Sequence, residues 1–212
     1  MLGVMSIKEF IDKVSSSEPV PGGGSVAALC GALSAALMEM VVHITKKKEG
    51  DTDSKSQFSS ILEKEMHFKS EFIKYIDRDA DAFARVMEAY RLPKNTESEK
   101  KLRLYAIERA LKEAARIPME VAEHAFQLLE ISKYIVENGN RNAITDCAVA
   151  VILIRGAILS ALYNVKINLL SIKDTAFTDE MKEKAMRLAK ETIKKEREIL
   201  SVVDKIMAGE GN

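Results

Sequence analysis

Hydrophobic residues recur at steps of three and four along most of the chain, which is the spacing of one face of an α-helix. Phe72, Ile76 and Phe83 show this spacing within one long stretch. The pattern predicts helices at about 6–14, 25–48, 55–90, 97–136, 143–170 and 178–206. No stretch alternates as a run of strands would. The expected fold is all-α: one domain spanning 1–212, built as a bundle of long helices.

Local signals mark where several of these helices begin or change direction. Capping boxes of the form S/T-x-x-E occur at 6–9 and 96–99. A proline inside a helix removes a donor, so Pro118 is expected to kink or split its helix. Thr178 and Asp179 are expected to cap the last helix.

The stretches 26–42 and 147–170 are the most apolar of the chain. Glu39 interrupts the first stretch, and Arg155 and Lys166 interrupt the second, so we expect core helices and no membrane contact. The second helix is apolar on nearly every side and should therefore be central. A second copy of the chain would supply the remaining cover, which predicts a homodimer.

Composition removes several classes of function. Lys+Arg and Asp+Glu number 32 each, so no global positive field favours nucleic acid. The two cysteines form no CxxC motif and the three histidines are scattered, so no metal is expected. The N-terminus lacks the pattern of a secretory signal, which predicts a cytoplasmic protein.

A glycine-rich segment stands directly before the second predicted helix. Gly22, Gly23, Gly24 and Ser25 follow a Ser/Pro-rich loop. Free amides and the helix dipole at such a position can hold a carboxylate or phosphate. The alternative is a tight turn into a helix that packs closely against its neighbours.

Asp79 occupies a core position of an otherwise apolar stripe, four residues before Phe83 and three after Ile76. A buried carboxylate is unfavourable unless it is paired or its pKa is shifted. Asp79 is thus either a tuned acid or base, or a member of a buried ion pair.

Polar residues crowd the start of the most apolar helix, where Asp146 either caps the helix or serves chemistry. Asn164 lies five turns later on the same side, and Asn168 one turn beyond it. Asp146 and Asn164 are then about 27 Å apart, too far for one small site within a chain. They could border the two ends of a groove, or meet across an antiparallel pair of subunits.

Several of these motifs together resemble the formiminotetrahydrofolate cyclodeaminase / methenyltetrahydrofolate cyclohydrolase family. The resemblance rests on PVPGGGSVAAL at 19–29, DADAF at 79–83, AYRLPK at 89–94, Gly139-Asn140 with Asp146, and NVKIN at 164–168. It implies an all-α homodimer with no cofactor beyond the tetrahydrofolate substrate. The implied reaction is cyclisation of 5-formiminotetrahydrofolate to 5,10-methenyltetrahydrofolate with loss of ammonia, a step of one-carbon metabolism and histidine degradation. The alternatives are methenyltetrahydrofolate cyclohydrolase activity and a non-catalytic folate-binding dimer.

The resemblance also suggests roles for individual residues. Asp79 and Asp146 are the expected catalytic carboxylates, one moving a proton and one stabilising the cation. The expected ligands of the pterin ring are Asn140, Asn142, Asn164 and Asn168. The glutamate or polyglutamate tail is assigned to the 22–25 segment and to Lys47.

Overall fold

The computed structural model describes residues 1–48 and 52–210, with the side chains of 47, 48 and 52–56 excepted. Every regular element in this part of the chain is helical, which confirms the predicted all-α class. The elements are η1 (Leu2–Val4), α1 (Ile7–Val14), α2 (Gly23–Lys48), α3 (Thr52–Arg91), α4 (Glu97–Asn138), η2 (Arg141–Ala143), α5 (Ile144–Leu169) and α6 (Thr175–Met207).

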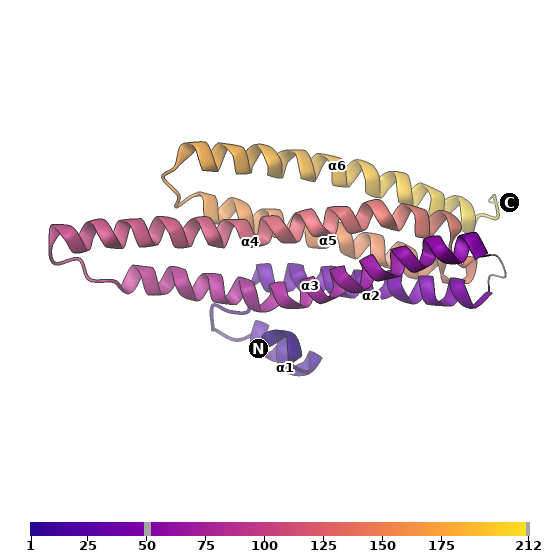
Figure 1. The fold of residues 1–212 in the computed structure, drawn as a ribbon, viewed down its shortest axis with the longest axis horizontal. Helices are drawn as coiled ribbons and strands as arrows, with labels where there is room; N and C mark the ends of the chain where they lie inside the picture. Colours follow the sequence, from indigo (N-terminus) through magenta and orange to yellow (C-terminus); the bar gives the residue numbers. More distant parts are fainter. Residues whose placement is uncertain (49–51, 211–212) are drawn as a thin grey trace.

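The long helices α2 to α6 run side by side, each reversing the direction of the one before, and α1 lies outside the bundle (Figure 1). The far end of the α3–α4 hairpin projects beyond the other helices. Helix α5 packs against α2, α4 and α6, which confirms its predicted central place. Both α2 and α5 are long and apolar enough to cross a bilayer by length and composition alone, and 56% and 44% of their apolar windows are buried inside the bundle.

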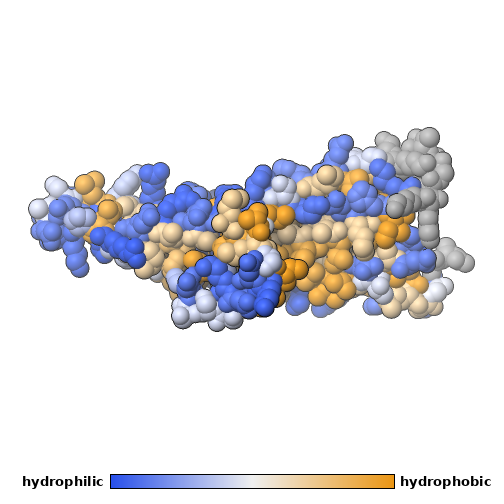
Figure 2. Space-filling model, turned by 90° about the horizontal axis from the view of Figure 1, so that it is seen from below, coloured by the Kyte–Doolittle hydropathy of each residue, from blue (hydrophilic) through white to orange (hydrophobic). Residues whose placement is uncertain are grey.

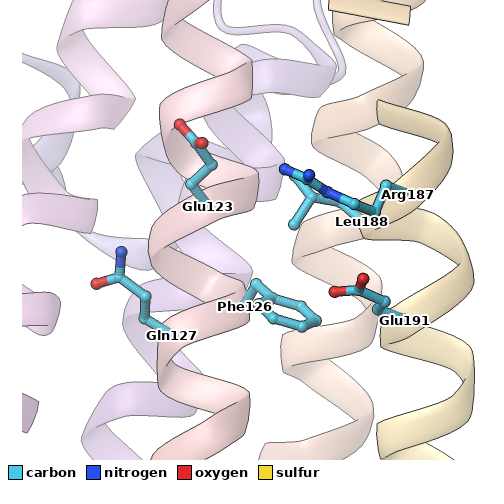
Figure 3. A pocket seen from close by; sticks show the side chains of 6 residues that line it. All are labelled: Glu123, Phe126, Gln127, Arg187, Leu188 and Glu191. Atoms are coloured by element: carbon cyan, nitrogen blue, oxygen red, sulfur yellow. The ribbon is translucent and has the colours of Figure 1, made fainter. Parts of the chain in front are cut away.

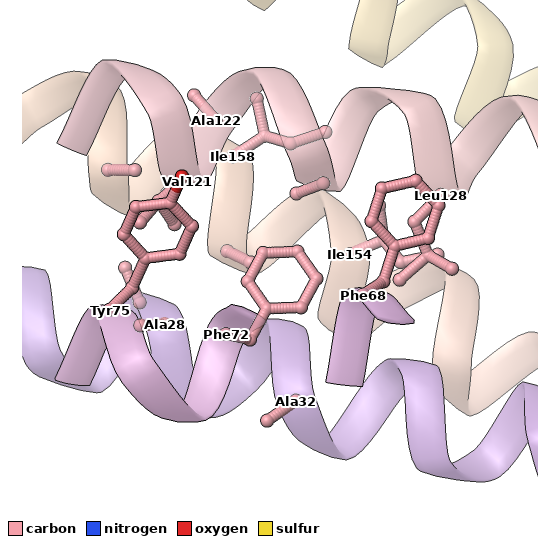
Figure 4. Packing of buried hydrophobic residues seen from close by; sticks show 14 of the residues in the cluster. Ala28, Ala32, Phe68, Phe72, Tyr75, Val121, Ala122, Leu128, Ile154 and Ile158 are labelled. Atoms are coloured by element: carbon pink, nitrogen blue, oxygen red, sulfur yellow. The ribbon is translucent and has the colours of Figure 1, made fainter. Parts of the chain in front are cut away.

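Close packing of α2 on α3 depends on small residues of α2. Phe72 of α3 is fully buried, and Ala28 and Ala32 of α2 lie beside it (Figure 4). A Cβ atom added at Gly31 would lie 2.7 Å from Cδ1 of Phe72. Glycine at this position therefore sets how closely the two helices approach.

Not all of the apolar surface is covered. On the face seen from the side of α1, hydrophobic side chains gather in a band beside the hydrophilic N-terminal part of the chain (Figure 2). Leu33 and Met40 of α2 and Val149 and Ile152 of α5 are among the exposed apolar residues.

Both predicted capping boxes are present, at Ser6 with Glu9 and at Thr96 with Glu99. The predicted cap of the last helix was wrong. Helix α6 begins at Thr175, because the side chain of Asp174 accepts a hydrogen bond from the amide of Phe177 at 3.1 Å. Gly23 and Gly24 are likewise the first residues of α2 rather than part of the loop before it.

The predicted break at Pro118 is also absent, since α4 runs unbroken from Glu97 to Asn138. Pro118 has no amide hydrogen to donate to the carbonyl of Ala114, four residues earlier. That carbonyl accepts a hydrogen bond from Nδ2 of Asn168 in α5 at 2.7 Å instead. A tertiary contact thus satisfies the group that the proline leaves without its helical partner.

Candidate active site

The carboxyl of Asp79 lies against the first turn of α2. The hydroxyl of Ser25 donates to Oδ2 of Asp79 at 3.1 Å, and also contacts the carbonyl of Ile76 at 2.9 Å. Ser25 is fully buried. The predicted anion site at this helix start is therefore in contact with a carboxyl group of the protein itself, that of Asp79.

Glycine at position 24 makes this approach possible. A Cβ atom built there would lie 2.0 Å from Oδ1 of Asp79, well inside contact distance. Any side chain at Gly24 would displace the carboxyl. The glycine-rich segment therefore packs closely against α3, as one of the two interpretations of the sequence expects, and the backbone of Ser25 donates to the Asp79 carboxyl. The binding of a ligand carboxylate or phosphate there stays a prediction.

Burial raises the pKa of Asp79, and the hydrogen bonds from the side chain and backbone of Ser25 oppose this rise. Burial is the larger effect, so the carboxyl holds its proton to higher pH than an ordinary aspartate. A carboxyl whose pKa is shifted in this direction is better suited to act as a general acid than an ordinary aspartate.

Asn164 of α5 completes the group on the other side of the α2 start. Its Nδ2 and Oδ1 lie 3.1 and 3.3 Å from the position that a Cβ of Gly23 would occupy. Nδ2 donates to the carbonyl of Ser160 at 2.9 Å, and the side chain is only partly buried. The structure thus brings together five predicted site residues: Gly23, Gly24, Ser25, Asp79 and Asn164.

Asn140, Asn142 and Asp146 lie at the opposite end of the α2–α5 pair. The amide of Asn140 donates to Oγ1 of Thr45 at 2.9 Å, and its side chain accepts from the amide of Asn142 at 3.1 Å. Asp146 stands in the first turn of α5. The side chain of Lys47 lies outside the described residues. Within one chain, Asn140, Asn142 and Asp146 do not reach Asp79.

Sequence reasoning missed a second unusual acid, Glu65 of α3. It is fully buried, and neither carboxyl oxygen has a hydrogen-bond partner. Burial and the neighbouring charge of Glu39 raise its pKa to about 9. Glu39 itself pairs with Lys69, and His43 lies 3.7 Å away. The sequence did contain a signal for Glu65. It lies at helical spacing between the buried residues Phe58 and Phe72, just as Asp79 lies between Ile76 and Phe83.

Two surface cavities lie elsewhere. One of about 300 Å³ is bordered by α4 and α6, where Phe126, Arg187 and Glu191 line it (Figure 3). One of about 870 Å³ lies in the α3–α4 hairpin and is lined by Arg85, Arg109 and other residues. None of the predicted site residues lines either cavity. Across the described residues, no group of three or more His, Cys, Asp and Glu side chains could hold a metal ion.

A partly buried carboxyl with a raised pKa, set at a helix start beside a partly buried asparagine, defines a candidate acid–base enzyme built on a helical bundle. The chain belongs to the formiminotransferase-cyclodeaminase family, whose model matches residues 6–187. This confirms the resemblance drawn from the glycine-rich segment and the aspartate and asparagine motifs.

Individual relatives agree with the family assignment. A methenyltetrahydrofolate cyclohydrolase of Methylorubrum extorquens is 37% identical over 180 residues, covering 85% of this chain and 86% of the relative. The formimidoyltransferase-cyclodeaminase of Mus musculus is 31% identical over 88% of this chain, which spans only 34% of that longer protein. A crystal structure of formiminotetrahydrofolate cyclodeaminase from Thermotoga maritima matches 99% of this chain and 98% of its own, with a TM-score of 0.82 and 32% identity.

Proposed function

We propose that this protein cyclises 5-formiminotetrahydrofolate to 5,10-methenyltetrahydrofolate and releases ammonia, with Asp79 as the acid. The carboxyl of Asp79 carries this proposal, because burial raises its pKa while Ser25 and Gly24 fix its place. The full-length similarity to the Thermotoga maritima cyclodeaminase supports the choice of reaction.

The reaction needs a proton at one defined atom. N10 of the folate attacks the formimino carbon, the proton of N10 passes to the imino nitrogen, and the product is a tetrahedral centre that bears an amino group. That amino group must gain a proton before it leaves as ammonia, and the product ring carries a positive charge. A carboxylic acid can donate the proton to the amino group, and the carboxylate that remains can stabilise the positively charged ring. We assign both to Asp79.

The residues around Asp79 then position the substrate. Asn164 offers an amide beside the start of α2, suited to the polar edge of a pterin ring. Asn168 has a structural partner in the carbonyl of Ala114, and its contact with the pterin ring stays a prediction. The assignment of the glutamate tail to Gly22–Ser25 and Lys47 also stays a prediction.

A second candidate reaction is hydrolysis of 5,10-methenyltetrahydrofolate. The relative from Methylorubrum extorquens favours it, since that cyclohydrolase matches this chain along 86% of its own length. The same aspartate would then act as the base that removes a proton from water, and a raised pKa also strengthens a base.

The remaining expectations belong to the same proposal. We place the protein in the cytoplasm, as a homodimer, in folate one-carbon metabolism and histidine degradation, with no membrane partner. The exposed apolar residues of α2 and α5 support the dimer, because they lie on neighbouring helices and a second copy would cover them.

An absorbance assay with two substrates tests the proposal. The methenyl product absorbs in the near ultraviolet, so cyclisation of 5-formiminotetrahydrofolate gives rising absorbance, with ammonia released in equal amount. We expect this result. If 5,10-methenyltetrahydrofolate decays faster than in buffer while the first substrate is unchanged, hydrolysis is the correct reaction. No change with either substrate contradicts both reactions.

A further inference from the structure

The side of α3 that carries Asp79 continues beyond the start of α2 into the projecting end of the hairpin. Helix α2 begins at Gly23, and Gly24 already lies against the Asp79 carboxyl. The last turns of α3, up to Arg91, belong to the part of the α3–α4 hairpin that extends past the other helices (Figure 1). The face of α3 that α2 covers as far as Asp79 is therefore open from that point to the hairpin tip.

Three large apolar side chains follow Asp79 along this face. Phe83, Met87 and Tyr90 stand at steps of four, four and three, and at about 100° per residue these steps keep them within about 80° of Asp79 around the helix. Their exposed fractions are 37%, 39% and 43%. Phe83 is about 6 Å and Tyr90 about 17 Å from Asp79 along the helix axis. An exposed row beside a candidate active site suits a ligand with an apolar, flat part, and we call these three residues the α3 shelf.

Positive charges follow at the far end of the α3 shelf. Arg91 and Lys94 come directly after Tyr90, and among the described residues no carboxylate pairs with either of them. The guanidinium of Arg103 in α4 lies 5.8 Å from the centroid of the Tyr90 ring and donates to the Tyr90 carbonyl at 3.0 Å. Residues 84–103 contain six basic and three acidic side chains, whereas the whole chain has equal numbers. The hairpin tip therefore favours an anionic group.

An acid, an apolar row and positive charges thus follow one another along one side of the hairpin. The folate substrate presents complementary groups in the same order: the reacting N10, the aromatic p-aminobenzoyl ring bonded to it, and the carboxylates of the glutamate. We propose that the α3 shelf binds this half of the substrate, with the aromatic ring on Phe83 and Met87. The glutamate carboxylates then lie at Arg91, Lys94 and Arg103, which can donate charge-assisted hydrogen bonds to them.

This inference rests on the proposed function and extends it to the AYRLPK motif at 89–94, which the chemistry at Asp79 does not use. It also gives the glutamate tail a direction. The assignment of the tail to Lys47 leads the opposite way, because Lys47 stands 22 residues after Ser25 on α2, about 33 Å along the helix. The path along the hairpin begins beside Asp79 and stays within one chain.

Calorimetric binding tests the α3 shelf without turnover. The probes are 5-formyltetrahydrofolate, which carries the aromatic ring and the glutamate, and 6-methyltetrahydropterin, which carries neither. Phe83→Ala should weaken binding of the first probe by at least about 5-fold and leave binding of the second unchanged, whereas Phe83→Tyr should keep the affinity for both. Phe126→Ala, in the cavity between α4 and α6, is the matched control and should bind both probes like wild type. Unchanged affinity of a folded Phe83→Ala protein for 5-formyltetrahydrofolate would overturn the proposal.

A longer tail tests the direction of the path. The pentaglutamate of 5-formyltetrahydrofolate should bind wild type more tightly than the monoglutamate does, because it brings more carboxylates to the positive tip. Arg91→Ala combined with Lys94→Ala should remove most of this difference, and Lys47→Ala should leave it in place. A difference that survives the double variant and disappears in Lys47→Ala would overturn the path along the hairpin.

Turnover of the wild type separates the two levels of the account. If wild type binds 5-formyltetrahydrofolate through Phe83 but converts neither folate, the proposed function fails and the α3 shelf stands as a folate-binding surface. If wild type is active and Phe83→Ala binds and reacts equally well, the α3 shelf fails and the proposed function stands. A wild-type protein that binds no folate would contradict both.

Discussion

At the scale of single residues, burial raises the pKa of both Asp79 and Glu65 on α3, and the surroundings of these two carboxyls differ. Asp79 has Ser25 as a hydrogen-bond donor and a helix start beside it, whereas Glu65 has neither and lies near the charge of Glu39. We propose that the first arrangement, at Asp79, serves proton transfer. The surroundings of Glu65 lower the stability of the fold when its carboxyl is charged, and this loss of stability can be measured.

Glu65 makes stability depend on pH. Its pKa is about 9 in the folded chain and about 4.5 when unfolded, so between these values the folded state binds one more proton. The free energy of unfolding should therefore fall as pH rises from 4.5 to 9, by at most about 1.4 kcal/mol per pH unit. Urea titrations at pH 6 and pH 8.5 measure this fall. Glu65→Gln should remove most of it, and the exposed control Glu63→Gln should not.

Gly24 should be essential for activity rather than for folding. Gly24→Ala forces the Asp79 carboxyl away from the start of α2, and a displacement near 1 Å lowers turnover by about 100-fold. Gly31→Ala is the contrasting variant, because its clash is with Phe72 in the core. That change should destabilise the fold by about 1–3 kcal/mol, with turnover per folded molecule largely kept. Equal turnover for Gly24→Ala and wild type would show that the contact has no catalytic role.

At the scale of elements, local sequence signals predicted the long helices and two of their capping boxes. A tertiary contact decided that α4 continues past Pro118. The capping boxes at Ser6 and Thr96 lie within one turn, so the sequence shows both partners. The continuity of α4 at Pro118 depends on Asn168, which is 50 residues away in the chain. Neither periodicity nor proline chemistry could reveal that contact. The start of α6 at Asp174 was missed because Thr178 and Asp179 carry an equally good local signal.

A double-mutant cycle can test whether the hydrogen bond from Asn168 to Ala114 compensates for Pro118. Asn168→Ala leaves the carbonyl of Ala114 unsatisfied and should destabilise the fold by about 1–3 kcal/mol. Pro118→Ala restores an amide that can donate to this carbonyl, so in its presence the effect of Asn168→Ala should be much smaller. Chemical denaturation of the four proteins measures the coupling. Additive effects would mean that Asn168 does not compensate for the proline.

At the scale of the whole molecule, the sequence predicted the bundle and the central helix, and the length of α5 already separated Asp146 from Asn164 by about 27 Å. Asp79, Gly23, Gly24, Ser25 and Asn164 meet because α2, α3 and α5 pack together at one end. Asp146 and Asn140 lie at the other end because α5 is one continuous helix. Helix geometry alone separates Asp146 from Asn164, whereas only the three-dimensional arrangement shows that Asp79 lies against Gly24 and Ser25.

The central claim is that Asp79 performs proton transfer on a folate one-carbon unit. Its most direct test is the turnover of 5-formiminotetrahydrofolate by wild type and Asp79→Asn, followed as near-ultraviolet absorbance and ammonia release. Thermal unfolding of both proteins serves as the control for folding. We predict active wild-type protein and a variant at least about 100-fold slower with an intact fold. Near-wild-type turnover by a folded Asp79→Asn protein would contradict the account.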